Sequence, residues 1–265
     1  MLSTDFVPGA PNWLDLGAPD TDAAVSFYSA VFGWQFQSAG PQGGGYGFFV
    51  QDEKTVAGLG PLTEEGASSA WTLYFHTADA DATAKAVEQA GGTVRVPPDD
   101  VFSFGRMGQF SDPAGADFAV WQPGDTKGVD LVNTPNSLTW AELYTTDAAA
   151  AKDFYRAVFS WQLTDMDMGQ GMTYTVLTPA GGTEDNSHGG LMQLHQDNLD
   201  AGSGPEWHPY FEVADCDAVY AKGLEAGGTT LIPPMDAPGI GRMAMLTDPA
   251  GAPFALIKSE QAPPS

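Results

Sequence analysis

The chain has 265 residues, and 34 acidic residues against 10 basic ones give it a formal net charge of −24 at pH 7. Such a charge repels the phosphates of nucleic acids and the head groups of anionic lipids, so we expect neither nucleic acid nor membrane as a partner. Hydrophobic residues make up 43% of the sequence and aromatic residues 11%, which is typical of a folded globular protein and not of acidic disorder.

The sequence also indicates where the protein works. No apolar run reaches the roughly 20 residues that a membrane helix needs, and the opening MLSTDFVPGAPNW lacks the features of a secretory signal. We therefore expect a cytoplasmic protein. The single cysteine, Cys216, lies between Asp215 and Asp217, a setting that raises a thiol pKa, so it is not a candidate nucleophile.

The first part of the chain has the pattern of a strand, a helix and further strands. Residues 13–16 alternate in polarity as a strand does. Asp20 is placed to cap a helix whose apolar residues recur at helical spacing through Val31. Strands are predicted at 46–51 and 55–59. The glycines at 43–45 do not precede a helix, so we interpret them as a flexible loop and not as a phosphate-binding one.

The next part repeats this order. A strand is predicted at 71–77, followed by a helix that either Asp79 or Asp81 caps and that ends at the glycines 91–92. Strands at 93–96, 107–111 and 117–121 follow. The sequence DPAG at 112–115 predicts a type I turn between the last two strands.

The second half of the chain duplicates the first. Residues 20–35 and 147–162 match at 10 of 16 positions, and residues 105–119 and 241–255 match at 10 of 15. A polar stretch rich in Pro, Gly and Asn lies between the halves at 123–137. We therefore predict a first domain over 1–124, a linker over 125–136 and a second domain over 137–265, with two βαβββ modules in each domain.

Several motifs carry a family resemblance. They are the helix sequences FYSAVFGW at 27–34 and FYRAVFSW at 154–161, the two DPAGA turns, and the WxDL and WxEL openings at Trp13 and Trp140. They resemble the vicinal oxygen chelate superfamily of glyoxalases, bleomycin resistance proteins and extradiol dioxygenases, above all actinobacterial four-module proteins often labelled hydroxylase, glyoxalase-like protein or antigen. The resemblance covers nearly the whole chain. It implies an α+β fold in which four βαβββ modules pair into two cupped mixed sheets with helices on the outer faces.

The resemblance also implies where a metal would bind, because metal-using members carry ligands on the first and last strands of each module. Carried over to this sequence, those places hold Trp13, Gly58, Thr72 and Ala119 in the first half and Trp140, Gly190, His208 and Ala255 in the second. Only His208 is a good ligand for a divalent ion, so no cofactor is expected. The alternative is a divalent-metal site made of His188, His208 and Glu142, two imidazoles and one carboxylate.

Strand alternation in phase with those places predicts which side chains face the cups. Aromatic and polar groups together are typical of a small-molecule pocket. The predicted ligand-binding residues are Trp13, Asp15, Thr72, Tyr74, His76, Trp121, Trp140, Glu142, Tyr144, His208, Tyr210 and Glu212.

Three of these residues are also candidates for catalysis. Asp15 and Glu142 recur at the same place in the two halves, and desolvation in an aromatic pocket raises a carboxyl pKa toward the range of a general acid or base. His208 is the third candidate. Arg106 and Arg242 are candidate partners of the carboxylates, and such pairing would lower the carboxyl pKa and leave Asp15 and Glu142 to orient a ligand.

We therefore predict a metal-independent protein that binds a small aromatic or hydrophobic molecule, in specialised metabolism or in resistance. The alternatives are a metal-dependent enzyme, either a glyoxalase-type lyase or isomerase or an oxygenase, and a protein-interaction role. The pairing of the modules stays open. If the first pairs with the second, Glu142 faces His208, and if the first pairs with the fourth, Asp15 faces His208. Four modules complete two cups within one chain, so we expect a monomer.

Overall fold

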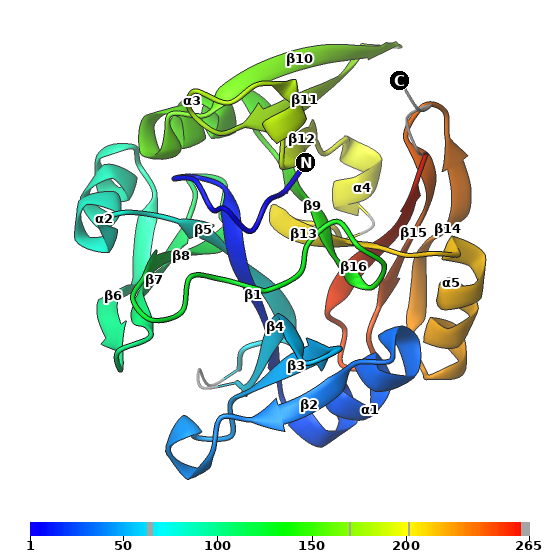
Figure 1. The fold of residues 1–265 in the computed structure, drawn as a ribbon. Coiled ribbons are helices and arrows are strands. Elements are labelled where there is room, and N and C mark those ends of the chain that lie inside the picture. Colours follow the sequence, from blue (N-terminus) through cyan, green and yellow to red (C-terminus); the bar gives the residue numbers. More distant parts are fainter. Residues whose placement is uncertain (63–65, 170, 201, 261–265) are drawn as a thin grey trace. The chain divides into compact units, whose positions relative to one another are not determined.

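The computed structural model describes residues 1–62, 66–169, 171–200 and 202–260, and Figure 1 shows the arrangement of their elements. Within these ranges, no helix is both long enough and apolar enough to cross a membrane. The elements follow one another as four βαβββ modules, which confirms the predicted order.

The first half contains two modules. The first is built from β1 (Pro11–Ala18), α1 (Thr21–Phe32), β2 (Gln35–Ser38), the short 3-10 helix η1 (Pro41–Gly43), β3 (Gly47–Gln51) and β4 (Lys54–Pro61). The second is built from β5 (Ala70–His76), α2 (Ala80–Gln89), β6 (Thr93–Val101), β7 (Gly105–Ser111) and β8 (Asp117–Pro123).

The second half repeats them with small additions. The third module contains β9 (Ser137–Thr145), α3 (Ala148–Phe159), β10 (Gln162–Gly169), β11 (Met172–Thr178), the 3-10 helix η2 (Glu184–Asn186), β12 (Gly189–Gln193) and α4 (Gln196–Asp200). The fourth contains β13 (Glu206–Glu212), α5 (Cys216–Glu225), β14 (Thr229–Ala237), β15 (Gly241–Thr247) and β16 (Pro253–Ser259).

Each long helix begins after an aspartate. The side chains of Asp20, Asp79, Asp147 and Asp215 each accept a hydrogen bond, at 2.9 to 3.0 Å, from the backbone N–H three residues later. These bonds satisfy one of the donors that a helix leaves open at its start. Of the two caps considered for α2, the structure therefore selects Asp79, and Asp81 lies in the first turn.

The strands form two eight-stranded mixed sheets. The strand order is β2-β3-β4-β1-β5-β8-β7-β6 in one sheet and β10-β11-β12-β9-β13-β16-β15-β14 in the other. The pairs β1·β4, β5·β8, β9·β12 and β13·β16 are parallel. β1 adjoins β5 and β9 adjoins β13, so each sheet pairs the two modules of one half. The predicted α+β fold is confirmed, and of the two pairings the sheets follow the first.

The helices pair differently and divide the chain into two compact units. Unit 1 comprises residues 1–14, 72–128 and 140–208, and unit 2 comprises residues 15–71, 129–139 and 209–265. In unit 1, α2 packs against α3, and in unit 2, α1 packs against α5 (Figure 1). Each unit therefore joins a helix of the first half to a helix of the second half.

Both units are centred on a buried tyrosine that bonds to a turn of the other half. In unit 2, the Trp71 indole N–H donates to the Tyr28 hydroxyl (2.9 Å), which donates to Asp248 (3.3 Å). In unit 1, Trp207 donates to Tyr155 (2.9 Å), which donates to Asp112 (3.3 Å). Burial raises the pKa of both aspartates, although backbone N–H groups of their own DPAGA turns oppose this. Because the tyrosine and the aspartate come from different halves, neither half alone completes a core.

Two predicted boundaries are corrected. The predicted glycine loop at 43–45 partly overlaps the turn of η1, and a strand, β2, precedes it. The strand predicted at 93–96 continues to Val101, because β6 pairs with β7 through two register shifts, and the second of these spans Pro97 and Pro98.

Candidate functional site

The central strand of the second sheet, β9, presents different residues to its two faces. Ala141 and Leu143 are completely buried. Trp140, Glu142 and Tyr144 alternate with them and so share the opposite face. Of these three, Glu142 is a carboxylate with only 5% of its surface exposed, and a buried charge needs partners.

Two tyrosines supply those partners within unit 1. The Tyr144 hydroxyl donates to Oε2 of Glu142 at 2.8 Å, and the Tyr174 hydroxyl on β11 also donates to the Glu142 carboxylate. Tyr174 in turn accepts a hydrogen bond from the Trp140 indole N–H at 2.9 Å. Burial and the neighbouring Glu142 charge hold the pKa of Tyr174 well above its usual value of 10, so this phenol stays a donor at neutral pH.

His208 on β13 joins the same group of side chains. Its ring lies edge-on to that of Tyr144, with centroids 5.0 Å apart, and only 4% of the residue is exposed. Nε2 lies 2.9 Å from a carboxylate oxygen of Glu206, but both ring nitrogens are buried and neither makes a hydrogen bond in the part of the chain that the structure describes. We call Trp140, Glu142, Tyr144, Tyr174 and His208 the second-half cluster.

A glycine makes room for this arrangement. Gly190 on β12 pairs with Glu142 across the sheet, and a Cβ atom at residue 190 would lie 1.8 Å from the Tyr174 hydroxyl. The phenol therefore occupies the space that a side chain at residue 190 would need. Residue 190 is one of the places at which metal-using relatives were expected to carry a ligand.

Unit 2 holds a smaller version of the same arrangement. The Tyr46 hydroxyl donates to Oδ2 of Asp15 at 2.9 Å, and both residues are partly exposed. The hydroxyl lies 2.0 Å from where a Cβ atom of Gly58 would be, and the Tyr46 ring covers Gly60 as well. We call Asp15 and Tyr46 the first-half pair.

Neither tyrosine was among the predicted site residues. Tyr46 immediately precedes β3 and Tyr174 lies near the start of β11, at corresponding places in the two modules, and each covers a glycine of the neighbouring strand. In an alignment of the two halves, Tyr46 and Tyr174 recur at one position and Gly58 and Gly190 recur at another. That recurrence is the signal in the sequence that could have identified both tyrosines.

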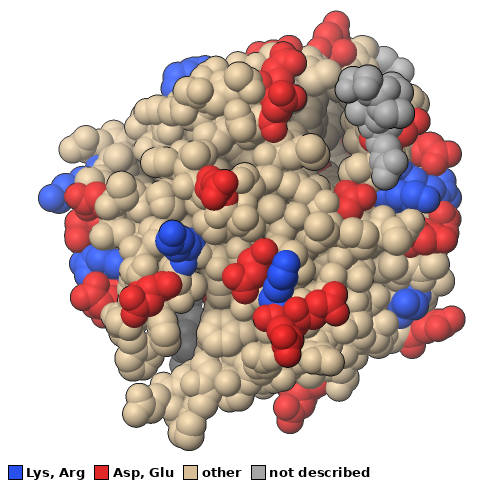
Figure 2. Space-filling model, in the orientation of Figure 1, with Lys and Arg blue, Asp and Glu red and all other residues tan. Residues whose placement is uncertain are grey.

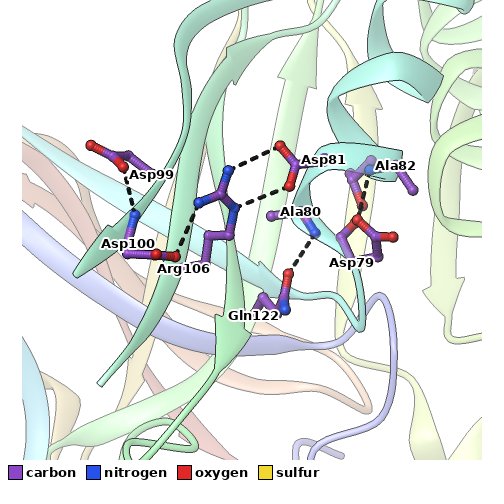
Figure 3. Close-up of polar contacts among 9 residues, drawn as sticks. Asp79, Ala80, Asp81, Ala82, Asp99, Asp100, Arg106 and Gln122 are labelled. Atoms are coloured by element: carbon purple, nitrogen blue, oxygen red, sulfur yellow. Dashed lines mark hydrogen bonds and ion pairs between the residues drawn. The ribbon is translucent and has the colours of Figure 1, made fainter. Parts of the chain in front are cut away.

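The two arginines considered as partners of Asp15 and Glu142 bond to other carboxylates. Arg106 bonds to both carboxylate oxygens of Asp81 (3.2 and 3.0 Å) and to Asp100 (3.0 Å), as Figure 3 shows. Arg242 makes the corresponding bonds to Asp217 and, at 2.9 Å, to Asp236. Both arginines therefore tie the first turn of a helix to an adjacent strand. Their bonds to the first turns of α2 and α5 put both arginines on the helix side of their strands.

The three residues of the alternative metal site, His188, His208 and Glu142, do not form a metal-holding group within the described residues. His188 immediately precedes β12 and is completely buried between Trp161 (centroids 5.0 Å apart) and Phe75 (6.3 Å). These rings belong to the aromatic core of unit 1, so His188 is a core residue. Burial lowers the pKa of His188 to about 3, so the ring is neutral.

The residues at the expected metal places do not fit a metal. Gly58 and Gly190 are covered by tyrosine hydroxyls, and Ala119 and Ala255 carry no donor atom. Across residues 1–62, 66–169, 171–200 and 202–260, no three His, Cys, Asp or Glu side chains lie close enough together to hold an ion. His208 is the one good ligand among the eight places, and one ligand does not make a site.

The remaining predicted residues lie in both units. In unit 1, Trp13 and Tyr74 are buried, Thr72 is partly exposed, and His76 pairs with Trp121 across β5 and β8. In unit 2, Tyr210 is buried, and Glu212 accepts hydrogen bonds from the backbone (3.0 Å) and hydroxyl (2.6 Å) of Ser259. Cys216 is buried, and desolvation raises the pKa of its thiol to about 11, which agrees with an inert cysteine.

A surface pocket of about 360 Å³ also lies in unit 1, between the start of α3 and strands β11 and β12. Two of its polar side chains already have partners: Gln193 accepts from the Ala148 N–H (2.7 Å), and Lys152 bonds to Asp165 (2.7 Å). The second-half cluster, with its buried carboxylate and unpartnered imidazole nitrogen, is therefore the stronger candidate site.

Comparisons with known proteins agree with the duplicated fold. A family model described as Glyoxalase/Bleomycin resistance protein/Dioxygenase superfamily matches residues 10–120 and 137–256. The anthracycline biosynthesis protein DauV of Streptomyces sp. (strain C5) is 39% identical over 282 residues, which cover 99% of this chain and 98% of that protein. The anthracycline biosynthesis protein DnrV of Streptomyces peucetius is 39% identical over 281 residues, with the same coverage.

A solved structure supports the fold at lower identity. The Mn(II)-bound glyoxalase from Novosphingobium aromaticivorans superposes with a TM-score of 0.61 and 15% identity, covering 96% of this chain and 86% of that one. At this identity the likeness concerns the fold alone.

Proposed function

Because the chain belongs to the glyoxalase/bleomycin resistance protein/dioxygenase superfamily, we propose that it binds a small hydroxylated aromatic molecule at the second-half cluster, without a metal, in the biosynthesis of an aromatic specialised metabolite. Members of this superfamily bind small-molecule substrates. The metal-free binding, the kind of ligand and its place in the second half are our proposals.

The observation that carries the proposal is the buried carboxylate of Glu142, oriented by two phenols. Hydrogen bonds from the hydroxyls of Tyr144 and Tyr174 orient this carboxylate. A carboxylate fixed in this way is a strong acceptor for a hydroxyl group of a ligand. The unpartnered Nδ1 of His208 offers a second polar contact, and the rings of Trp140 and Tyr144 offer flat surfaces for stacking.

The relatives support the class of ligand. Two of them, each 39% identical over nearly the whole chain, are named for anthracycline biosynthesis. Anthracyclines have a flat, fused, hydroxylated ring system, which combines the two features that the second-half cluster suits. We therefore propose an anthracycline-like polyketide, or a precursor of one, as the ligand.

The proposal departs from the metal-dependent alternative. Glycines covered by phenols and alanines stand where metal ligands were expected, and these residues favour a site in which tyrosine hydroxyls take over the polar contacts. The catalytic roles predicted for Glu142, His208 and Asp15 stay predictions.

Binding of quinizarin, an uncharged dihydroxyanthraquinone, tests the proposal. Titration calorimetry should show saturable binding by the wild type and about 10-fold weaker binding by Glu142→Gln, because a charged acceptor is replaced by a neutral one. Glu88→Gln, the same change at an exposed position of α2, is the control and should bind like the wild type. Equal affinity of Glu142→Gln and wild type would refute this site.

Metal content is measured separately. Elemental mass spectrometry of untagged protein purified without chelator should find well under one Fe, Mn, Ni or Zn ion per chain, also after incubation with those ions. A stoichiometric ion that is required for quinizarin binding would overturn the metal-free part of the proposal and restore the metal-dependent enzyme.

A further inference from the structure

The turn between β6 and β7, in unit 1, exposes two aromatic rings. Phe102 is 67% exposed and Phe104 is 45% exposed, and their ring centroids lie 6.0 Å apart in an edge-to-face arrangement. Two adjacent exposed phenylalanines cost free energy in water and contribute nothing to the core. On the face shown in Figure 2, by comparison, charged side chains are scattered among uncharged ones and the basic residues do not gather into a patch.

The backbone of this turn is strained. The Phe104 N–H donates to the Val101 carbonyl at 3.0 Å, and Phe102 between them has a φ of 50°, which bulky residues avoid. The corresponding turn of unit 2, Ala237 to Ile240, closes with the same bond but contains Pro238 and Gly239. There the glycine takes the positive φ of 76°. By the Gly-Arg sequence that follows each turn, Phe102 corresponds to Pro238 and Ser103 corresponds to Gly239. The fold can therefore be made without a bulky residue at positive φ, whereas unit 1 places a phenylalanine there.

The strained turn is held firmly next to a buried tryptophan. Backbone N–H groups of Gly124 and Thr126 donate to the Phe104 carbonyl at 2.8 and 3.0 Å. The Thr126 carbonyl accepts from the Trp121 indole N–H at 2.8 Å, and the same indole lies over Gly105, 2.5 Å from where a Cβ atom would be. Phe104 is thus adjacent in sequence to Gly105, which the Trp121 indole covers, and two backbone hydrogen bonds hold the Phe104 carbonyl in place.

A polar group lies beside that tryptophan. His76 on β5 is the cross-strand neighbour of Trp121, and its Nδ1 atom is buried without a hydrogen-bond partner in the described part of the chain. Burial lowers the pKa of His76, so at neutral pH the ring is uncharged. A buried, unpartnered ring nitrogen beside aromatic residues is expected where a ligand supplies the missing bond.

We propose that Phe102, Phe104, Trp121 and His76 form a second ligand site, which binds a flat, uncharged aromatic molecule carrying a polar oxygen. The rings of the turn and of Trp121 supply stacking surfaces, and Nδ1 of His76 bonds to the oxygen. This site lies on other strands than the second-half cluster and stands on its own observations. The strain at Phe102 is then the cost of presenting an aromatic ring at a rigid turn.

Binding at the two proposed sites is distinguished by substitutions and by the NMR signals of the histidine rings. The chain has four histidines, so ¹⁵N-labelled imidazole signals can be assigned by single substitutions. Quinizarin should perturb the ring signals of both His76 and His208, and calorimetry should resolve two binding events. The double variant Phe102→Gly/Phe104→Ser should weaken the event linked to His76 about 10-fold, the loss expected when aromatic stacking is removed. Ile240→Ser, at the matching turn of unit 2, should leave both events unchanged.

The single variant Phe102→Gly is the control that separates loss of binding from loss of the fold. Phe102→Gly should raise the thermal midpoint, because glycine relieves the positive φ, while it weakens binding at His76. A variant that is more stable and binds less cannot have lost the ligand through unfolding.

Each outcome decides between the proposals. If the His76 signals do not move, or if the double variant binds as the wild type does, the second site is refuted, and the phenylalanines are left as a contact surface for another protein. If His208 moves and His76 does not, the proposed function stands alone. If His76 moves and His208 does not, the second site stands and the second-half cluster is refuted as a quinizarin site.

Discussion

The third module in unit 1 and the first module in unit 2 descend from one duplicated sequence, and both hold a carboxylate under a tyrosine that covers a glycine. In unit 1 these are Glu142, Tyr174 and Gly190, and in unit 2 they are Asp15, Tyr46 and Gly58. The glycine explains why both pairs persist. Because the glycine has no side chain, the phenol hydroxyl comes close enough to the carboxylate to form a hydrogen bond with it.

The two modules differ in what surrounds the shared pair. Tyr144 in unit 1, which adds a second phenol, corresponds to Gly17 in unit 2. Met192 corresponds to Gly60, which the Tyr46 ring covers directly. The two halves thus share the carboxylate and its phenol, while only the second half has a second phenol as donor and a buried carboxylate. This difference is why we place the proposed function in the second half.

The largest expected effect concerns another corresponding pair, His188 in unit 1 and Val56 in unit 2. Both are completely buried, but neither ring nitrogen of His188 has a hydrogen-bond partner among the described residues. Leaving a buried polar group unpaired costs about 1–3 kcal/mol. His188→Val, which copies unit 2, should therefore raise the free energy of unfolding by about 2 kcal/mol at pH 7, measured by urea denaturation.

The same substitution has a pH signature. The pKa of His188 is about 3 in the folded protein, below its ordinary value of 6.5, so the unfolded chain takes up the proton first as pH falls. The wild type should lose stability from pH 6.5 downward by up to about 1.4 kcal/mol per pH unit through this residue, and His188→Val should lack that loss. Parallel stability curves for the two proteins between pH 7 and pH 5 would contradict the assignment. Val56→His is the reverse control and should introduce the loss.

The second-largest expected effect is on stability, when the carboxylates of Glu142 and Asp15 are removed in turn. Glu142→Ala should lower the free energy of unfolding by about 2 kcal/mol, because the hydroxyls of Tyr144 and Tyr174 both lose their acceptor. Asp15→Ala should cost under about 1 kcal/mol, because the first-half pair is partly exposed and water replaces the acceptor. Urea denaturation of both variants at pH 7 measures the difference. If both variants lose the same free energy of unfolding, the two carboxylates are equally stabilised. That result would contradict the difference between the halves on which the proposed site rests.

Much of the fold could be predicted from the sequence because its determinants are local or repeated. Each capping aspartate starts a helix within three residues, and the DPAGA turns fix the last two strands of each half. The division into units could not be predicted. The bonds that define it, such as Tyr28 to Asp248, join residues 220 positions apart, and nothing near either residue indicates the other.

Strand alternation predicts which residues of the candidate site share a face, whereas the ends of strands and the partners of charged groups depend on the fold. Strand alternation assigned Trp140, Glu142 and Tyr144 to one face, and the side chains within the cluster bond to one another as this implies. Alternation cannot tell where a strand begins. His188 lies one residue before β12, so its predicted face was wrong. The arginines were assigned to the carboxylates by charge alone, although helix aspartates in the first turn are nearer in the fold.

The smallest effect is at the C-termini of the equivalent helices α1 and α3, where the sequences FGW and FSW differ by one residue. Gly33 ends α1 with a φ of 75° and Ser160 ends α3 with a φ of 57°, and each N–H donates back to the helix at 2.9 Å. The left-handed conformation costs a non-glycine residue about 1 kcal/mol. Ser160→Gly should therefore raise the free energy of unfolding by up to about 1 kcal/mol. Gly33→Ser should lower it by the same amount, since no atom lies within 4 Å of where its Cβ would be and conformation alone decides the sign. Thermal denaturation of the two variants and of the double exchange measures this. Changes of the same sign in both single variants would show that the two helix ends, unlike the sequences around them, are not equivalent.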